Sequence, residues 1–178
     1  MGRVLSKAIE AAGLSEYLAR ALAGTALSQS DTDRLRAADL LLVAGLADEV
    51  RAHFRGDDVR IVPKSRVREP KLVVFDVAPE AAGPTGAEVL REIALLRLRT
   101  PGDTAVAVSY DALGLELAQT ALLFGADVLF GELAGKRTLP LLDGPSARRR
   151  EIAGLVERSG RRPRFADEAD QVVAEQSP

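Results

Sequence analysis

Polar residues follow several of the short β-branched runs in this sequence, at the positions where parallel β/α proteins place their working residues. Asp76, Ser109, Tyr110 and Glu132 each come directly after such a run or one residue later. Two carboxylates can divide the roles of general acid and general base when their surroundings separate their pKa values. Asp76 and Glu132 are therefore candidates for a paired-carboxylate site, and helix capping or simple solvation is the alternative explanation of both residues.

A glycine-containing loop at 79–86, PEAAGPTG, precedes a helix-length segment. Backbone N–H groups at the start of a helix can bind an anion, so phosphate binding is one hypothesis for this loop. The loop contains neither the GKS/T of a P-loop nor the GxGxxG of a dinucleotide site. The loop therefore predicts a helix start and leaves anion binding as a secondary alternative.

Residues 57–166 alternate short β-branched runs with amphipathic segments of helix length, the pattern of parallel β/α units. The predicted strands are 59–62, 72–77, 104–109 and 127–130, and the predicted helices are 87–99, 115–124 and 147–158. At about 30 residues per unit this stretch holds three to four units. The predicted fold class is α/β, with N-terminal helices followed by a partial parallel β/α half barrel or a small open sheet.

The first 56 residues predict helices only. Apolar stripes end at Gly13 and Gly24, and Ser30 with Asp33 resembles a capping box that opens one long helical stretch through Val50. The segment 1–56 is thus expected to be an N-terminal helical segment before the partial barrel at 57–166. The acidic, polar tail at 167–178 is expected to be disordered.

The composition excludes several kinds of chemistry. The 178 residues contain no cysteine and one histidine, His53, so a thiol nucleophile, a cysteine-ligated metal and a histidine-based metal site are excluded. A net charge of -2 argues against general binding to nucleic acid or to an anionic membrane, and the arginines at 148–164 fit a solvated helix face better than a nucleic-acid groove. No apolar run is long enough to span a membrane and no signal-peptide pattern is present, so a cytoplasmic location is expected.

Several segments of the chain resemble radical S-adenosylmethionine enzymes of the menaquinone futalosine route. That group includes aminofutalosine synthase and dehypoxanthine futalosine cyclase, and the deazaflavin FO synthase is similar. The segments, in the order found in the family, are DLLLVAGLADEVRAHFRGDDVRIV at 39–62, PTGAEVLREIALLRL at 84–98, LGLELAQTALLFGADVLFGEL at 113–133 and IAGLVERSGRRPRFAD at 152–167. The resemblance implies a β/α barrel of which this chain keeps the first and the late strands.

The chain differs from this family in the segment that carries the family's catalytic cluster. In the family, the strand that matches 59–62 leads into CxxxCxxC, whose thiolates hold a 4Fe-4S cluster that cleaves S-adenosylmethionine. Here 63–70 reads PKSRVREP, and a late-barrel strand follows at once. The resemblance therefore implies a partial barrel without the cluster loop, without the central strands and without radical chemistry.

Late-barrel positions are the ones that the resemblance carries over. They are Thr85, Gly86, Gly114, Gln119, Gly125, Asp127, Gly131 and Glu132. The glycines are expected to be mainly structural. Together with the strand-end residues, the candidate ligand-binding set is Asp76, Thr85, Gly86, Ser109, Gln119, Asp127 and Glu132, with no catalytic residue and no metal ligand named.

Two functions remain as hypotheses from the sequence. The first is a pseudoenzyme, a catalytically inactive radical S-adenosylmethionine-like protein that acts as a binding or interaction module, associated with menaquinone biosynthesis. The second is a cofactor-independent enzyme or a binder of a small ligand, such as a nucleoside or phosphate, that uses the strand-end carboxylates. No cofactor is expected. The expected partners are a second copy of the chain or an intact paralogue, because a half barrel leaves strand edges and apolar faces that must be covered.

Overall fold

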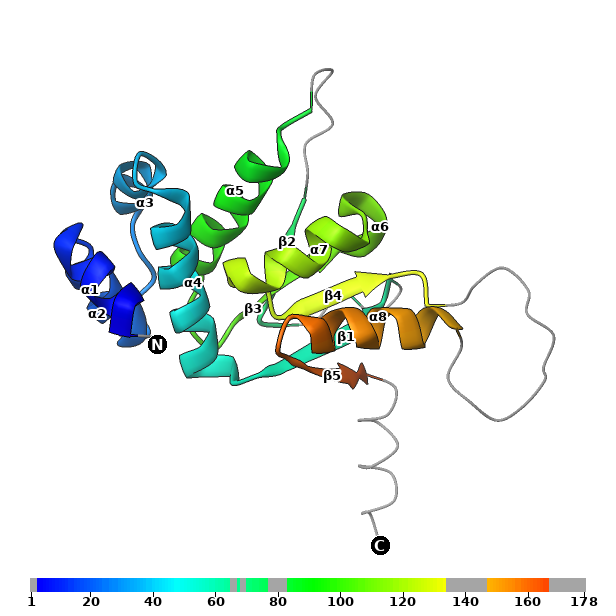
Figure 1. The fold of residues 1–178 in the computed structure, drawn as a ribbon. Coiled ribbons are helices and arrows are strands. Elements are labelled where there is room, and N and C mark those ends of the chain that lie inside the picture. Colours follow the sequence, from blue (N-terminus) through cyan, green and yellow to red (C-terminus); the bar gives the residue numbers. More distant parts are fainter. Residues whose placement is uncertain (1–2, 65–66, 68–69, 77–82, 134–146, 167–178) are drawn as a thin grey trace, which may run out of the picture.

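The computed structural model describes residues 3–64, 67, 70–76, 83–133 and 147–166, and its core is an all-parallel five-stranded sheet that follows a set of N-terminal helices (Figure 1). The predicted α/β fold class is therefore confirmed. The predicted tail at 167–178, Val77 at the end of one predicted strand, and residues 79–82 of the loop at 79–86 lie outside the described residues.

The elements follow one another along the chain with short connections. The helices before the sheet are α1 (Arg3–Ala11), α2 (Ser15–Leu22), α3 (Gln29–Arg36) and α4 (Leu40–Arg55). The strands are β1 (Asp58–Pro63), β2 (Leu72–Phe75), β3 (Ala105–Ser109), β4 (Val128–Gly131) and β5 (Arg162–Phe165). The remaining helices are α5 (Gly86–Arg99), α6 (Tyr110–Leu113), α7 (Leu115–Ala121), the 3-10 turn η2 (Leu122–Phe124) and α8 (Ala147–Arg158).

The predicted capping box at Ser30 and Asp33 is wrong. The N-cap of α3 is Ser28, whose side chain accepts a hydrogen bond from the backbone N–H of Asp31, and the Asp31 carboxylate accepts one from the backbone N–H of Ser28. Asp31 also accepts a hydrogen bond from Arg20 of α2 at 2.5 Å, and this bond holds the pKa of Asp31 well below its usual range. The sequence offers the same Ser-x-x-Asp spacing twice, and the contact with Arg20 favours the earlier one.

The long helical stretch predicted through Val50 is two helices. Helix α3 ends at Arg36, and α4 begins after Asp39, whose carboxylate accepts hydrogen bonds from the N–H groups of Leu41 (2.8 Å) and Leu42 (3.2 Å). An aspartate that caps a helix in this way satisfies donors that the helix itself leaves unpaired.

The strand order is β2-β3-β4-β1-β5, so the first strand of the chain lies between the last two. Strand β1 pairs with β4 through Arg60 and Val128, and with β5 through Asp58 and Arg162. The sequence analysis predicted four strands and did not predict β5, because its RPRF sequence contains a proline and two arginines. Both features suit an edge strand, since proline cannot donate to a ladder and charged side chains discourage further pairing.

The helices bury their apolar side chains against one face of the sheet. The largest core cluster combines residues of α4, α5, α7 and α8 with Val59, Ile61, Val108, Leu129 and Phe165 of the strands. On the other face, the strand residues Val62, Ala105, Ala107, Val128 and Phe130 form a second, smaller cluster, against which Val67, Leu72 and Ala166 pack. Alternation along each strand therefore divides the buried residues between two faces.

The N-terminal helices share the main core with the sheet. Val43, Leu46 and Ala47 of α4 are fully buried in the same cluster as the strand residues, and α4 lies beside α5 (Figure 1). Among the described residues, none of the helices is both long enough and apolar enough to cross a membrane.

Candidate functional site

The carboxyl ends of three neighbouring strands bring together the strand-end residues singled out in the sequence. Phe75 of β2 pairs with Val108 of β3, and Ser109 of β3 pairs with Phe130 of β4. Asp76, Ser109 and Glu132 therefore lie along the same edge of the sheet, which we call the carboxyl edge. Asp76 and Glu132 are exposed, whereas Ser109 is half-buried.

Thr85 and Gly86 begin the helix that follows β2. Thr85 is the N-cap of α5, and its capping box with Glu88 is complete: the Glu88 carboxylate accepts from the Thr85 backbone N–H at 2.7 Å and from its hydroxyl at 2.8 Å. The backbone bond lowers the pKa of Glu88. An anion at this helix start would have to compete with the carboxylate of Glu88 for that N–H group, so the two residues have a structural use that needs no ligand.

Ser109 and Gln119 differ in their surroundings. The Ser109 side chain caps the short helix α6 by accepting a hydrogen bond from the Ala112 N–H at 3.2 Å. Gln119 is half-buried on α7, and the described part of the chain gives its side chain no hydrogen bond. The hydroxyl of Ser109 is thus already engaged as a cap.

Tyr110 is the most unusual residue at the carboxyl edge. It is 2% exposed, and among the described residues its hydroxyl has no hydrogen-bond partner although the oxygen is buried. The guanidinium of Arg148 lies over the tyrosine ring, 5.4 Å from its centroid. Burial, with a smaller contribution from Asp111, raises the pKa of Tyr110 to about 12.

The carboxylate of Asp111 lies between the end of β4 and Arg148, the residue that covers the Tyr110 ring. Its Oδ2 accepts a hydrogen bond from the backbone N–H of Glu132 at 2.8 Å, and its Oδ1 lies 3.8 Å from Nη2 of Arg148. The Nη1 atom of Arg148 bonds Glu151 at 2.9 Å. Tyr110, Asp111, Glu132 and Arg148 thus form one polar cluster at the ends of β3 and β4, which we call the Tyr110 cluster.

Gly131 makes this cluster sterically feasible. A Cβ atom at Gly131 would overlap the ring of Tyr110 and would lie 2.7 Å from Oδ2 of Asp111. Since no side chain fits there, glycine lets the tyrosine ring rest directly on the β4 backbone. The sequence analysis placed Tyr110 after a strand and took Gly131 from the family resemblance, but it gave no sign of this contact, which depends on β3 and β4 being neighbours.

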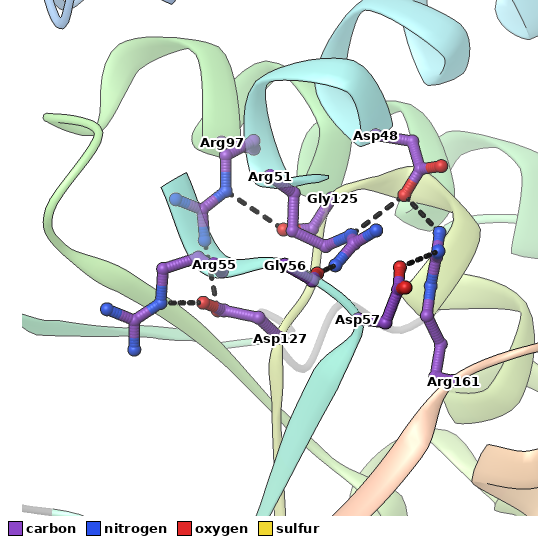
Figure 2. Close-up of polar contacts among 9 residues, drawn as sticks. All are labelled: Asp48, Arg51, Arg55, Gly56, Asp57, Arg97, Gly125, Asp127 and Arg161. Atoms are coloured by element: carbon purple, nitrogen blue, oxygen red, sulfur yellow. Dashed lines mark hydrogen bonds and ion pairs between the residues drawn. The ribbon is translucent and has the colours of Figure 1, made fainter. Parts of the chain in front are cut away.

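Asp127 lies at the opposite edge of the sheet from the other candidates. It precedes β4, is 2% exposed, and accepts hydrogen bonds from Arg97 (2.9 Å), Arg55 (2.7 Å) and the backbone N–H of Val106 (2.7 Å). Figure 2 shows its carboxylate between the two arginines. The structure therefore separates Asp127 from the carboxyl edge and surrounds it with contacts internal to the protein.

Arg97 extends this network to the starts of two strands. Its side chain is fully buried, with Nε donating to the carbonyl of Gly125 at 2.9 Å and Nη1 to the carbonyl of Thr104 at 2.8 Å. Gly125 has a left-handed φ of 92°, and a Cβ there would lie 2.8 Å from Cβ of Arg97. The glycine is thus required both by its backbone conformation and by the close approach of Arg97.

A second buried arginine, Arg51, binds the backbone at the C-terminal end of α4. Arg51 is fully buried, donates from Nε to Asp48 at 2.8 Å, and donates from Nη1 to the carbonyl of Gly56. Arg161 also reaches Asp48, at 2.6 Å, and so links α4 to the chain segment before β5 (Figure 2). We refer to the interactions of Arg97, Asp127, Arg51 and Asp48 as the amino-edge network.

Comparisons with known proteins identify no family for this parallel α/β chain. No family model matches the sequence, and no curated protein matches it. The resemblance to radical S-adenosylmethionine enzymes therefore stays a prediction. Within the described ranges, the structure contains no group of three or more histidine, cysteine, aspartate or glutamate side chains placed to hold a metal ion.

We predict that Asp127→Ala strongly destabilises the fold. The substitution leaves the buried guanidinium of Arg97 without its carboxylate, a change that costs about 3–5 kcal/mol in comparable pairs. Urea unfolding followed by circular dichroism measures the free energy of unfolding. Asp103→Ala is the matched control, since Asp103 pairs with Lys71 at the surface and its loss should cost less than about 1 kcal/mol. Equal effects of the two variants would contradict a special role for the buried pair.

We also predict that Tyr110 ionises only near pH 12 in the folded protein. The chain has two tyrosines and no tryptophan, so tyrosinate absorbance at 295 nm reports tyrosine ionisation directly. Tyr110→Phe should remove the step near pH 12, whereas Tyr17→Phe should keep it. Because the folded pKa exceeds the unfolded value of about 10, the contribution of Tyr110 to stability is present below about pH 10 and lost as the pH rises towards 12. A Tyr110 step at or below pH 10 would disprove the burial of its hydroxyl.

Proposed function

We propose that this protein is a catalytically inactive, radical S-adenosylmethionine enzyme-like binding module that takes a small polar ligand at the carboxyl edge of its sheet. The observation that carries the proposal is the convergence of Asp76, Ser109 and Glu132 on that edge from three neighbouring strands. In open parallel α/β sheets, ligands bind outside the carboxyl ends of the strands. The association with menaquinone biosynthesis belongs to the same proposal and depends on the family resemblance alone.

The strand order supports the idea of a partial barrel. Strand β4 lies beside β1, as the last strand of a closed β/α barrel lies beside the first. The sheet departs from a barrel on the other side of β1, where β5 takes the place that a second strand would have. A chain that keeps the first and late strands of a barrel, and adds a terminal strand to the free side of the first, accounts for this order.

The alternative function, a cofactor-independent enzyme, has less support from the geometry. The hydroxyl of Ser109 serves as a helix cap, and a serine nucleophile needs an adjacent base. His53, the one histidine in the chain, is exposed in the last turn of α4, which leads into the start of β1 and so lies near the amino edge. Asp76 and Glu132 are both exposed, so burial does not divide them into an acid and a base. Binding without turnover is therefore the function that we propose.

We predict that the protein is stabilised against heat by one member of a panel of S-adenosylmethionine, futalosine-type nucleosides and sugar phosphates. A ligand present at 100 times its Kd adds about 2.7 kcal/mol, which corresponds to a rise in Tm of about 5–10 °C for a chain of this size. Glu132→Gln should weaken binding, whereas Glu116→Gln, at an exposed position on α7, should not. Absence of any shift across the panel would overturn the proposal of a small-molecule site, and turnover of the bound compound would overturn the proposal of inactivity.

A second proposal concerns the partner, and it follows from the difference between the two edge strands. Strand β5 is protected by Pro163 and by the exposed arginines 162 and 164. Strand β2 has the sequence LVVF, and its Val74 is 38% exposed. Because an apolar edge strand invites pairing with another chain, we propose that a second copy, or an intact paralogue, associates through β2.

We predict that the protein forms a dimer that Val74→Lys converts to monomer. A lysine on an edge strand opposes pairing because its charge would have to be buried or placed beside its own symmetry mate. Light scattering coupled to size-exclusion chromatography measures the mass in solution. Val4→Lys is the matched control, since Val4 is 84% exposed on α1 and lies outside the sheet. A wild-type monomer, or a dimer that survives Val74→Lys, would rule out this association.

A further inference from the structure

The backbone groups of β2 point alternately towards β3 and towards the edge of the sheet. Among the described strands, β2 pairs only with β3. Ala105 of β3 lies opposite Leu72 and donates a hydrogen bond from its N–H to the carbonyl of Lys71 at 2.8 Å. In a parallel ladder, a residue bonds the two neighbours of the residue that it faces. Lys71 and Val73 therefore direct backbone groups towards β3, whereas Leu72 and Val74 direct theirs towards the edge of the sheet.

The two ends of β2 carry opposite charges. Lys71 precedes the strand and Asp76 follows it, and both residues are exposed. In an antiparallel pair of two such strands, the end of one strand lies beside the start of the other, so Asp76 of one copy lies near Lys71 of the other at both ends of the ladder. A parallel pair would bring like charges together, which is destabilising. The charges therefore favour an antiparallel pair of identical strands, which is the arrangement that a two-fold axis generates.

The conformation of Lys71 limits the register of such a pair. Its φ is 62°, outside the extended range, so regular pairing ends at Leu72. In an antiparallel ladder, two residues that face each other both direct their backbone groups towards the partner or both direct them away. Of the symmetric registers that meet this rule, the one centred on Val74 gives the longest ladder, with Leu72 opposite Asp76 of the other copy. A register centred on Val73 would have to include Lys71 to reach the same length.

We infer that two copies of this chain join through β2 in an antiparallel ladder centred on Val74, which extends the sheet across a two-fold axis and brings Lys71 of each copy to Asp76 of the other. Within one chain Lys71 pairs with Asp103 at 2.6 Å, but both side chains are exposed and such pairs contribute little, so exchanging this pair costs little. The second copy thereby supplies a cation beside Asp76 at the carboxyl edge. The inference rests on the association proposed above, and it specifies the partner as a second copy and fixes the register.

Disulfide cross-linking tests the register directly, because the chain contains no cysteine. A disulfide requires Cα atoms no more than about 7 Å apart, and hydrogen-bonded residues that face each other in an antiparallel ladder are about 5.5 Å apart. Val74→Cys should therefore give a covalent dimer on non-reducing electrophoresis after the full chain is oxidised with diamide. The matched control is Val4→Cys, 84% exposed on α1. It should link about tenfold more slowly or less, since it depends on random collisions.

A second pair of variants measures the same register independently. Leu72→Cys alone and Asp76→Cys alone should not link, because each position lies about 14 Å along the ladder from its own copy. An equal mixture of the two should link, because Leu72 of one copy faces Asp76 of the other. If Val74→Cys links no faster than Val4→Cys, or if Leu72→Cys alone links as fast as Val74→Cys, the register is wrong.

The charges at the strand ends give a third measurement. Asp76→Lys should weaken the dimer about tenfold, because it places two lysines together at both ends of the ladder. Adding Lys71→Glu to the same chain should restore most of the loss, since the ends are then complementary again. The matched control is Glu116→Lys, at an exposed position on α7, which should leave the Kd unchanged. Analytical ultracentrifugation over a dilution series measures that Kd, and no recovery in the double variant would contradict the antiparallel arrangement.

This inference and the proposals on which it rests fail in different ways. If Val74→Lys separates a wild-type dimer but Val74→Cys does not link, the inferred register is wrong and the association through β2 stands. A wild-type monomer overturns both the association and the register. Neither result affects the proposed binding function, which depends on the thermal panel alone.

Discussion

The buried ion pair between Arg97 and Asp127 is the interaction on which the rest of the structure depends. Asp127 accepts hydrogen bonds from two arginines and from the backbone N–H of Val106 in β3. Arg97 also donates to the carbonyls of Thr104 and Gly125, which precede β3 and β4. Charges buried this deeply are tolerated only when each is paired and fully hydrogen-bonded. The end of α5 and the starts of two strands are thereby fixed relative to one another at a single place.

The contacts at the amino edge also influence which residues meet at the carboxyl edge. Because β3 and β4 are held in register, Tyr110 at the end of one strand meets Gly131 at the end of the other. The Asp127 carboxylate at the amino edge is fully engaged by contacts within the protein, although Nη2 of Arg51 and Nε of Arg161 are buried there without a partner among the described residues, as is the hydroxyl of Tyr110 at the carboxyl edge. In parallel β/α barrels, residues at the amino ends of the strands contribute mainly to stability, whereas ligand sites lie at the carboxyl ends.

Local patterns in the sequence predicted the helices at 87–99, 115–124 and 147–158 and four of the strands. Amphipathic periodicity indicates a helix with one buried face, and a β-branched run indicates a buried strand. These local patterns did not predict β5, because the burial of Phe165 beside Ile61 depends on a strand pairing between distant parts of the chain. The family resemblance placed Asp127 among the candidate ligand contacts, but its carboxylate lies in the amino-edge network. The position of a residue in the sequence identifies the strand end it occupies, but the partners of its side chain depend on packing between elements.

The place of β1 between β4 and β5 also has a consequence for the order in which the chain acquires structure. During synthesis β1 is made before both of its neighbours in the sheet, which come from the last third of the sequence. Arg60 can pair only after Val128 has been made, and Asp58 only after Arg162. Contacts of such high sequence separation slow folding and prolong the exposure of strand edges. The helices before β1 can form locally in that interval, because their hydrogen bonds join residues that are close together in the sequence.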